Sequence, residues 1–449
     1  MIIEQFEDKE LSHFSYAIIS ESEVVLVDPA RDIEPYLNFV QKHQARIIGV
    51  IETHPHADFI SSHLELHQIV GAKIYCSKLL AANYPHEFFD DGDFIQFGKV
   101  KLKALNTPGH SPDSISIVLE HAGKDKAVFT GDTLFIGDCG RPDLRENAGN
   151  ITAKQEELAR QMYHSLRDKL MKLYDSVLVY PAHGAGTLCG KSLSEASAST
   201  IGEEKATNWS LQEMSEGAFV KVLTEDLPFI PNYFAFDVEL NKKGTGAMRK
   251  SIDAITSGKT ISSAEDVTRL DRNIKIIDTR DSDSFKEKHL ANSINIMADG
   301  KFETWLGTIL FPEEPFYLAA ENSETLSELL KRVAKIGYEP FIKEAFVVQF
   351  GETESAKIDL RAFKSHPENY TIVDVRNEKE VKEKAVFPSA IHIPLPELRE
   401  RISDIAVDKP IVVHCAGGYR SAAGSSILEN NLDAVNVYDL SKAVNGFSK

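Results

Sequence analysis

The feature that most constrains the fold is a series of histidines and aspartates, each of which stands where a predicted strand turns into a loop. The run "ARIIGVIE" leads into "THPHAD", which places His54, His56 and Asp58 at alternate positions. Apolar runs of this length predict buried strands, and the Gly and Pro residues beside them predict turns. The other members stand in "NTPGHSPDS", "FTGDTLF" and "VYPAHGAG", as His110, Asp132 and His183. We expect these strand ends to meet at one sheet edge, where imidazole and carboxylate groups form a metal site.

A second constraint is an internal repeat in the second half of the chain. The segments "IKIIDTRDSDSFKEKHLANSINI" (274–296) and "YTIVDVRNEKEVKEKAVFPSAIHIP" (370–394) share a strand, an Asp-x-Arg triplet, an acidic helical stretch and a turn into another strand. Because each segment is followed by a further strand and helix, the repeat predicts two parallel α/β domains. At roughly 150 residues per domain, a chain of 449 residues accommodates three domains. We expect these domains at 1–255, 260–352 and 355–449.

The net charge and the cysteines narrow the class of protein. A net charge of -18 argues against nucleic acid or an anionic membrane as a partner, because both would repel the chain. No apolar run reaches the ~20 residues of a membrane span, and "MIIEQFEDKE" lacks the features of a signal peptide. The four cysteines lie far apart, without the spacing of a disulfide framework. We therefore expect a cytoplasmic protein with reactive rather than structural thiols.

The order of motifs, H-x-H-x-D, G-H, G-D and A-H-G, resembles that of the metallo-β-lactamase superfamily. The resemblance covers residues 1 to about 255 and implies an αββα sandwich. Two-metal hydrolases of that superfamily have a histidine directly after the aspartate of the first motif, whereas this chain has Phe59 after Asp58. Since a phenyl ring supplies no ligand, the second metal position lacks one of its residues.

The remaining side chains suit a single metal, because two imidazoles and a carboxylate form the facial triad of non-haem iron(II) oxygenases. In this respect the chain is similar to the persulfide dioxygenases of the superfamily, which implies one Fe(II) per chain. The residues that the resemblance implies as metal ligands are His54, His110 and Asp132. It places His56 and Asp58 close to the metal rather than on it, and we expect His183 to lie with them.

Two further stretches lie close to these motifs. "GDCGRPDL" (137–144) resembles the C-G-R-x-D signature of the persulfide dioxygenases, which implies that Arg141 and Asp143 shape the substrate pocket. The alternative is a structural salt bridge between these two residues. Cys189 follows His183 by six residues and is expected near the metal. It is either a relay for sulfane sulfur or a small buried thiol in a Gly-rich loop.

The stretch "IVVHCAGGYRSAAG" ends a predicted strand at Cys415, passes through a short loop to Arg420 and enters a helix. The N–H groups of the loop, the helix N-terminus and the guanidinium all favour a thiolate, which is the nucleophilic form. The loop resembles the C-x-x-x-x-R loop of the rhodanese sulfurtransferases, in which both residues are catalytic. The first repeat has Ala319 or Ala320 at the cysteine position and no arginine after it, so we expect it to be inactive.

With these resemblances, the predicted fold is α/β: an αββα metallo-β-lactamase sandwich followed by two rhodanese-like parallel α/β domains. The implied function is Fe(II)- and O2-dependent oxidation of a low-molecular-weight thiol persulfide to sulfite, in sulfide detoxification. It is coupled to sulfane-sulfur transfer through Cys415, which forms or uses thiosulfate. The implied partners are the persulfide, O2, sulfite and thiosulfate, and we expect a homo-oligomer.

Two other functions remain open at this point. A thioester hydrolase of the glyoxalase II type requires two zinc ions, and Phe59 argues against it. A non-catalytic persulfide carrier or sensor would use Cys415 while the metal is structural. Structural metal sites are closed by protein ligands, whereas the set in this chain leaves coordination positions open.

Overall fold

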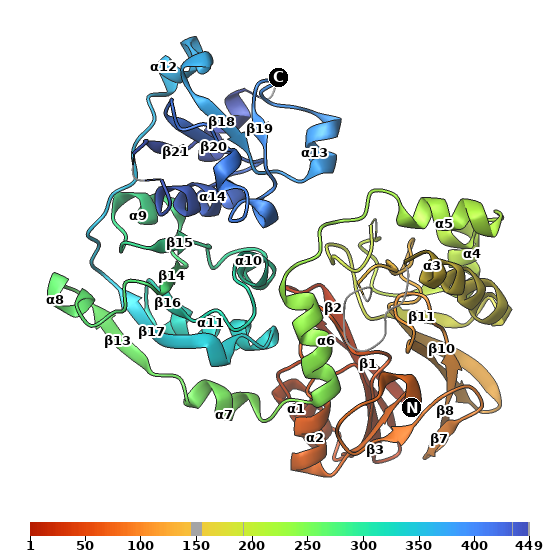
Figure 1. The fold of residues 1–449 in the computed structure, drawn as a ribbon. Coiled ribbons are helices and arrows are strands. Elements are labelled where there is room, and N and C mark those ends of the chain that lie inside the picture. Colours follow the sequence, from red (N-terminus) through yellow and green to blue (C-terminus); the bar gives the residue numbers. More distant parts are fainter. Residues whose placement is uncertain (145–154, 192, 433, 448–449) are drawn as a thin grey trace. The chain divides into compact units, whose positions relative to one another are not determined.

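A computed structural model describes the chain over residues 1–144, 155–191, 193–432 and 434–447 (Figure 1). The chain forms two compact units. Unit 1 comprises Met1–Lys250 and Ala334–Gly337, and unit 2 comprises Ser251–Val333 and Tyr338–Lys449. Unit 2 contains both segments of the internal repeat, and the predicted boundaries between three domains stay a prediction.

In the described part of unit 1, two mixed six-stranded sheets pack face to face. The first has the order β1 (Ile2–Asp8), β2 (His13–Ser20), β3 (Glu23–Val27), β4 (Arg46–Ile51), β5 (Lys73–Cys76) and β6 (Glu87–Phe88). The second has the order β12 (Ser199–Thr200), β11 (Leu178–Pro181), β10 (Lys124–Gly131), β9 (Ile115–His121), β8 (Val100–Asn106) and β7 (Phe94–Phe97). The helices of this unit are α1 (Glu34–Lys42), α2 (His63–Val70), α3 (Gln155–His164), α4 (Ile201–Thr207), α5 (Glu216–Thr224) and α6 (Tyr233–Lys243).

The core of unit 1 lies between the two sheets and comes from alternating side chains. Along β8, Val100, Leu102 and Ala104 are buried in this core while the residues between them are only half-buried. Strand β2 is buried along its whole length, because helices cover its second face. Apolar side chains of α1 and α2 pack on the outer face of the first sheet, and those of α3, α4 and α5 pack on that of the second. The predicted αββα sandwich is confirmed.

The described residues of unit 2 form two sheets whose strands are all parallel. The first has the order β13 (Ser257–Ile261), β17 (Ile342–Val348), β16 (Phe316–Ala320), β14 (Lys275–Asp278) and β15 (Ser293–Asn295). The second has the order β19 (Ile391–His392), β18 (Thr371–Asp374), β20 (Ile411–His414) and β21 (Val437–Asp439). The remaining helices are α7 (Met248–Asp253), α8 (Ala264–Val267), α9 (Ser282–Glu287), α10 (Phe302–Ile309), α11 (Ser323–Lys335), α12 (Leu360–Ser365), α13 (Glu378–Glu383) and α14 (Tyr419–Glu429).

The internal repeat has a structural counterpart in a pair of ion pairs. Arg280 pairs with Asp278 at 2.6 Å and Arg376 pairs with Asp374 at 2.6 Å, each at the end of the corresponding parallel strand. In both segments the arginine Nη2 also donates to the carbonyl of the residue eight positions later. The Asp-x-Arg triplet therefore anchors the same helix-and-turn connection in both sheets.

A half-buried carboxyl group, that of Glu429, marks the C-terminal end of α14. Glu429 Oε2 accepts a hydrogen bond from Ser355 Oγ at 3.0 Å, whereas the nearby Lys286 pairs with Asp439. Burial raises the pKa of Glu429 to about 7, and the charge of Asp439 adds to this effect. Glu429 therefore keeps its proton in the folded protein at pH values where an exposed glutamate is ionised.

Replacing Glu429 with glutamine should stabilise unit 2 at pH 8 by about 2 kcal/mol, and far less at pH 5. The carboxyl group of Glu429 ionises near pH 4.5 in the unfolded chain and near pH 7 in the folded protein. Its ionisation therefore destabilises the folded state increasingly between these pH values, and the full free-energy cost is reached only above pH 7. Urea unfolding of the full chain in a Trp209→Phe background, followed by Trp305 fluorescence, measures this difference. The exposed Glu383→Gln is the matched control, and an equal gain at both pH values would contradict the assignment.

Candidate metal centre and sulfur-transfer loop

The predicted ligands in unit 1 all stand in loops at strand ends. His54, His56 and Asp58 follow β4, while His110 lies between β8 and β9. Asp132 directly follows β10, and His183 stands two residues after β11. Because β4, β10 and β11 belong to two sheets packed face to face, their ends meet and bring these side chains together. This placement follows from the strand-end pattern of the sequence.

Three of these side chains form the tightest candidate site. Asp132 Oδ2 lies 3.5 Å from His110 Nε2 and 3.8 Å from His54 Nε2. The three ligand atoms lie within 4.8 Å of one another, and all three residues are buried. Two imidazole nitrogens and one carboxylate oxygen at this spacing suit a single divalent metal ion.

The two imidazoles are oriented by hydrogen bonds at Nδ1. His54 Nδ1 lies 3.0 Å from Thr53 Oγ1, and Thr53 donates its hydroxyl and its backbone N–H to Asp28, at 2.8 and 2.7 Å. Because the Thr53 proton goes to Asp28, the hydroxyl accepts from His54 and fixes the proton of His54 on Nδ1. His110 Nδ1 lies 3.0 Å from the backbone carbonyl of Arg141, which has the same effect. Both rings therefore direct an unprotonated Nε2 toward Asp132.

The surroundings of the Asp132 carboxylate indicate whether a cation fits between these three side chains. Within the described ranges, neither of its carboxylate oxygens has a hydrogen-bond partner, although the side chain is only 1% exposed. A buried ionised carboxylate without partners is energetically costly. A divalent cation held between Asp132 and the two Nε2 atoms removes that cost, so the residues present fit a metal.

A second group of side chains lies on the other side of Asp132. His183 Nε2 is 3.4 Å from Asp58 Oδ2 and 3.6 Å from Asp132 Oδ1, and His56 completes a buried trio. His56 Nε2 lies 3.2 Å from Asp28 Oδ1. Although burial disfavours the imidazolium, the Asp28 carboxylate raises the pKa of His56 to about 9. The structure thus brings all the predicted neighbours to the site, and their role beside the metal stays a prediction.

Phe59 occupies the position at which a two-metal hydrolase has a further ligand. Its side chain is 1% exposed, and its ring centroid lies 4.3 Å from that of His56 and 3.9 Å from that of His13. The phenyl ring thus fills the space between two histidines with an apolar group. This position contributes packing instead of a nitrogen ligand.

Two residues of this region, His13 and Asp28, were not predicted from the sequence. His13 is the first residue of β2 and belongs to no motif, so only the fold brings it beside His56 and His183. Burial lowers the pKa of His13 well below its usual value, and its two histidine neighbours add to the effect, so it is neutral. Asp28, in contrast, directly follows β3, and the same strand-end pattern could have identified it.

Arg141 and Asp143 form a salt bridge with each other, as expected if the pair is structural. Arg141 Nε and Nη2 donate to the two carboxylate oxygens of Asp143, both at 2.7 Å. Among the described residues, its guanidinium also donates to backbone carbonyls, including those of Leu188 and Pro228. The guanidinium thus ties together the loop whose carbonyl at Arg141 orients His110. A role in the substrate pocket stays a prediction.

Cys189 lies within reach of the metal centre. Its Sγ is within 4.8 Å of ligand atoms of Asp132 and His183, and the side chain is 1% exposed. Burial raises the pKa of the Cys189 thiol well above its usual value, and the charges of Asp58 and Asp132 add to this effect. The thiol is therefore protonated in this environment, and its role as a sulfur relay stays a prediction.

In unit 2, Cys415 lies where the sequence predicts it, between β20 and α14. Gly418 N–H donates to Cys415 Sγ at 3.1 Å, and Ser421 Oγ lies 3.6 Å from the same sulfur. Gly418 has a φ of 107°, a value that L side chains rarely adopt, and this turn aims its N–H at the sulfur. The loop thus places an N–H donor and a helix N-terminus at Sγ, which stabilise negative charge there.

Arg420 is held by a partner that the sequence reasoning did not identify. Its Nη1 and Nη2 donate to the two carboxylate oxygens of Glu380, at 2.5 and 2.7 Å. Although burial disfavours the Glu380 carboxylate, Arg420 outweighs it and lowers the pKa of Glu380. Arg420 still interacts electrostatically with Cys415. The contacts show an arginine that anchors the loop, and direct contact with substrate stays a prediction.

Strand register identifies the residue that replaces the cysteine in the first parallel sheet. Asp374 pairs with His414 in the second sheet, and the equivalent Asp278 pairs with Ala319 in the first. Ala320, the residue after Ala319, therefore stands in the place of Cys415. We call the first sheet of unit 2 and its helices the silent domain, because this position has no nucleophile.

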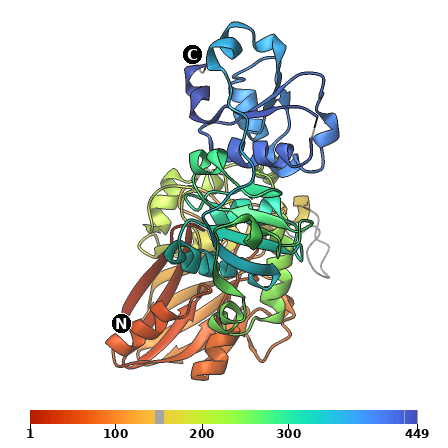
Figure 2. The ribbon, with the colours of Figure 1, turned by 90° about the vertical axis from the view of Figure 1, so that its left-hand side faces the viewer.

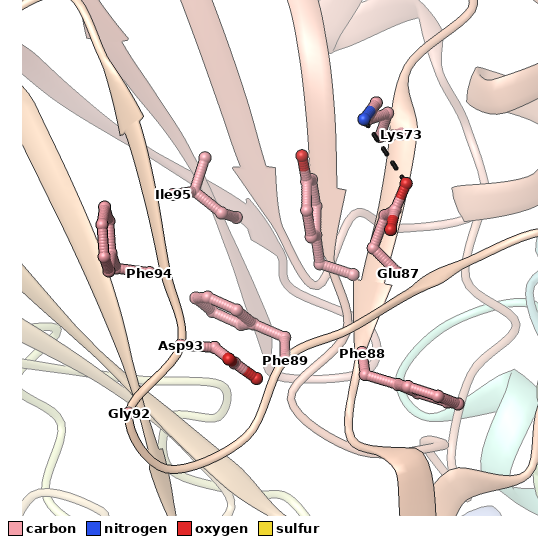
Figure 3. Close-up of a pocket in the computed structure, with 9 residues that line it drawn as sticks. Lys73, Glu87, Phe88, Phe89, Gly92, Asp93, Phe94 and Ile95 are labelled. Carbon is pink, nitrogen blue, oxygen red and sulfur yellow. Dashed lines mark hydrogen bonds and ion pairs between the residues drawn. The ribbon is translucent and has the colours of Figure 1, made fainter.

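A separate hollow in unit 1 contains none of these groups. It has a volume of about 320 Å³ and is lined by residues of β5, β6 and β7 (Figure 3). Phe88 and Phe94 at its rim are 63% and 55% exposed, and Lys73 pairs with Glu87 at 3.4 Å. Since it is lined by neither a candidate ligand nor a cysteine, it is not the reactive site.

Comparisons with known proteins agree with this architecture. The model of the metallo-beta-lactamase superfamily matches residues 8–183, and that of the rhodanese-like domain matches residues 359–449. The chain is 32% identical over 248 residues to the persulfide dioxygenase ETHE1, mitochondrial, of Bos taurus, across 54% of this chain and 88% of the relative. It is 35% identical over 176 residues to the cytoplasmic hydroxyacylglutathione hydrolase of Arabidopsis thaliana, across 38% of this chain and 63% of that protein.

A solved structure extends the likeness beyond unit 1. The metallo-beta-lactamase from Staphylococcus aureus subsp. aureus COL superposes with a TM-score of 0.66 at 30% identity, over 77% of this chain and 98% of that chain. Two packed mixed sheets with a His/Asp centre, followed by a parallel α/β domain with a Cys loop, define a metallo-beta-lactamase sandwich fused to a rhodanese-like domain. The chain belongs to the metallo-beta-lactamase superfamily, and it combines a domain homologous to the persulfide dioxygenase ETHE1 with a C-terminal rhodanese-like domain, the arrangement of a persulfide dioxygenase–rhodanese fusion.

Proposed function

We propose that the chain is an iron-dependent persulfide dioxygenase that also transfers sulfane sulfur through Cys415. The observation that carries this proposal is the buried trio of His54, His110 and Asp132. Phe59 supports it, because an apolar ring takes the position of a ligand that two-metal hydrolysis requires. The identity with persulfide dioxygenases over most of the relative's length supports the same substrate class.

In this proposal the trio holds one Fe(II) per chain. Iron bound there supplies the redox chemistry that activation of O2 requires, which zinc lacks. The protein supplies orientation, because Thr53 and the Arg141 carbonyl fix the rings of His54 and His110. In the overall reaction, both atoms of O2 and the oxygen of one water enter sulfite, and the thiol RSH leaves.

Cys415 performs the second half of the proposed function. Its thiolate attacks the outer sulfur of thiosulfate, the S–S bond breaks, sulfite leaves, and a persulfide remains on Cys415. A low-molecular-weight thiolate then takes the outer sulfur and regenerates the Cys415 thiolate. In reverse, with sulfite as the acceptor, the same loop forms thiosulfate. The N–H of Gly418 at 3.1 Å supports both directions, because it stabilises negative charge on Sγ.

A thioester hydrolase is the second candidate function, because two observations favour it. One is the likeness to a hydroxyacylglutathione hydrolase, and the other is the buried trio of His56, Asp58 and His183, which has metal-ligand spacing. Such an enzyme would bind two zinc ions per chain and hydrolyse a glutathione thioester without O2.

The cellular setting belongs to the same proposal. All four cysteines are unpaired and buried, which suits a reducing compartment such as the cytoplasm. Of the helices in the described ranges, none has both the length and the apolar character needed to cross a membrane. The proposed substrates are a thiol persulfide, O2, and sulfite or thiosulfate.

Product analysis tests the proposed function. Purified protein loaded with Fe(II) should consume one O2 and release one sulfite for each glutathione persulfide. The same protein should transfer sulfur from thiosulfate to a thiol. Hydrolysis of S-lactoylglutathione by the zinc-loaded protein, with no O2 consumption from persulfide, would favour the hydrolase instead.

A further inference from the structure

Helix α14, which begins at the Cys415 loop, is buried all round. Every residue from Ser421 to Leu428 is buried. A helix that covered only its own sheet would keep a polar face toward solvent. Instead α14 contacts β20 and β21 of its own sheet as well as β15 of the silent domain. Figure 1 shows the helix on the side of its sheet that faces β15, and in Figure 2 the dark blue helix lies at the edge of the blue segment next to the green one.

Hydrogen bonds join the two domains along this helix. The backbone N–H of Asn295 donates to Ser426 Oγ at 3.0 Å, and Asn430 Nδ2 donates to the carbonyl of Ser293 at 2.7 Å. The first contact lies in the second half of α14 and the second at its C-cap residue, so both are away from Cys415. They show that the silent domain supports the helix whose N-terminus forms the sulfur-transfer loop.

One contact reaches the loop itself. Tyr419 donates its hydroxyl to the backbone carbonyl of Met297 at 2.8 Å. Burial raises the pKa of Tyr419, so the hydroxyl stays protonated and remains a donor. Tyr419 stands between Gly418, whose N–H contacts Cys415 Sγ, and Arg420, which anchors the loop to Glu380. A shift of Tyr419 therefore moves the N–H that faces the sulfur.

The acceptor carbonyl is held in place by an arginine of the silent domain. Arg332 donates to the carbonyls of Ala298 and Gly300, directly after Met297. Its Nε and Nη2 also donate to the two oxygens of Glu303, both at 2.6 Å, in a buried ion pair. A guanidinium bound at two carbonyls and a carboxylate fixes the loop at residues 297–300, and with it the partner of Tyr419.

We propose that Tyr419 is a positioning residue through which the silent domain fixes the Cys415 loop for sulfur transfer. The silent domain then has a task in the reaction although Ala320 removes its own nucleophile. This inference rests on the proposed sulfurtransferase function, since it concerns the geometry of the same loop.

The variant Tyr419→Phe tests this proposal, because it keeps the ring and removes only the bond to Met297. We expect kcat/KM for thiosulfate to fall about fivefold, the loss that corresponds to one hydrogen bond. The alkylation rate of Cys415 by iodoacetamide, read from its peptide by mass spectrometry, should fall by a similar factor, and its pH profile should move toward higher pH. Persulfide-dependent O2 uptake should not change.

Ser426→Ala is the matched control, because it removes a bond between the same two domains at the far end of the same helix. We expect this variant to stay within about twofold of the wild type in both assays. Equal losses in the two variants would show a general docking effect and overturn the proposal, as would an unchanged Tyr419→Phe. Absence of transfer in the wild type would refute the sulfurtransferase function, whereas the alkylation rates would still test the position of the loop.

Discussion

Replacing His110 with alanine should lower persulfide-dependent O2 uptake by at least about 100-fold. His110 Nε2 is one of two imidazole nitrogens that face Asp132, and the buried carboxylate would lose a neighbour at 3.5 Å. The remaining pair, His54 and Asp132, leaves too few protein ligands to retain the metal. Iron content by elemental analysis should fall together with the O2 uptake, which an oxygen electrode measures with glutathione persulfide.

The same variant should keep its sulfurtransferase activity within about twofold, because Cys415 belongs to a separate compact unit. The matched control is His164→Ala, which removes an exposed histidine of unit 1 that pairs with Asp168 and Glu216. It should retain both iron and O2 uptake. If His110→Ala keeps its iron and its O2 uptake, the trio is not the metal site.

Replacing Cys415 with serine should lower thiosulfate sulfurtransferase activity by at least about 1000-fold. A serine hydroxyl is a much weaker nucleophile and cannot carry a persulfide, whereas a thiolate beside the Gly418 N–H can attack the sulfur and then carry it as a persulfide. O2 uptake with glutathione persulfide should remain within about twofold of the wild type. A coupled assay for cyanide-dependent thiocyanate formation measures the first activity.

Cys76→Ala provides the control for this experiment, because Cys76 is a buried thiol on β5. It should keep both activities. Simultaneous loss of O2 uptake and sulfur transfer in Cys415→Ser would contradict the division of labour between the two units.

The strand-end pattern predicted much of the candidate site, since most of its residues stand within a few positions of the end of a strand. His54 and Asp132 each follow a predicted strand within a few residues, and the topology of two packed sheets then brings them together. The repeat likewise predicted two parallel sheets. The loop from Cys415 to Arg420 could be predicted in full, because all its residues are contiguous in the sequence. Short-range sequence patterns are informative where a functional side chain lies at the end of a single strand or helix.

The residues that were not predicted from the sequence make contacts with residues far away in the chain. His13 reaches the site only through the pairing of β2 within the first sheet, and Glu380 meets Arg420 across 40 positions. The bond from Tyr419 to Met297 spans 122 positions and joins two domains. No periodicity or motif marks such contacts, because they depend on how complete sheets and helices pack.

The identity of the metal tests the central claim most directly. The protein should be purified after expression with both iron and zinc supplied, and its metal content and its O2 uptake with glutathione persulfide measured on the same sample. The account predicts one iron per chain and O2 uptake proportional to iron content. Two zinc ions per chain with no O2 uptake would contradict it, and would show that Phe59 does not prevent a two-metal centre.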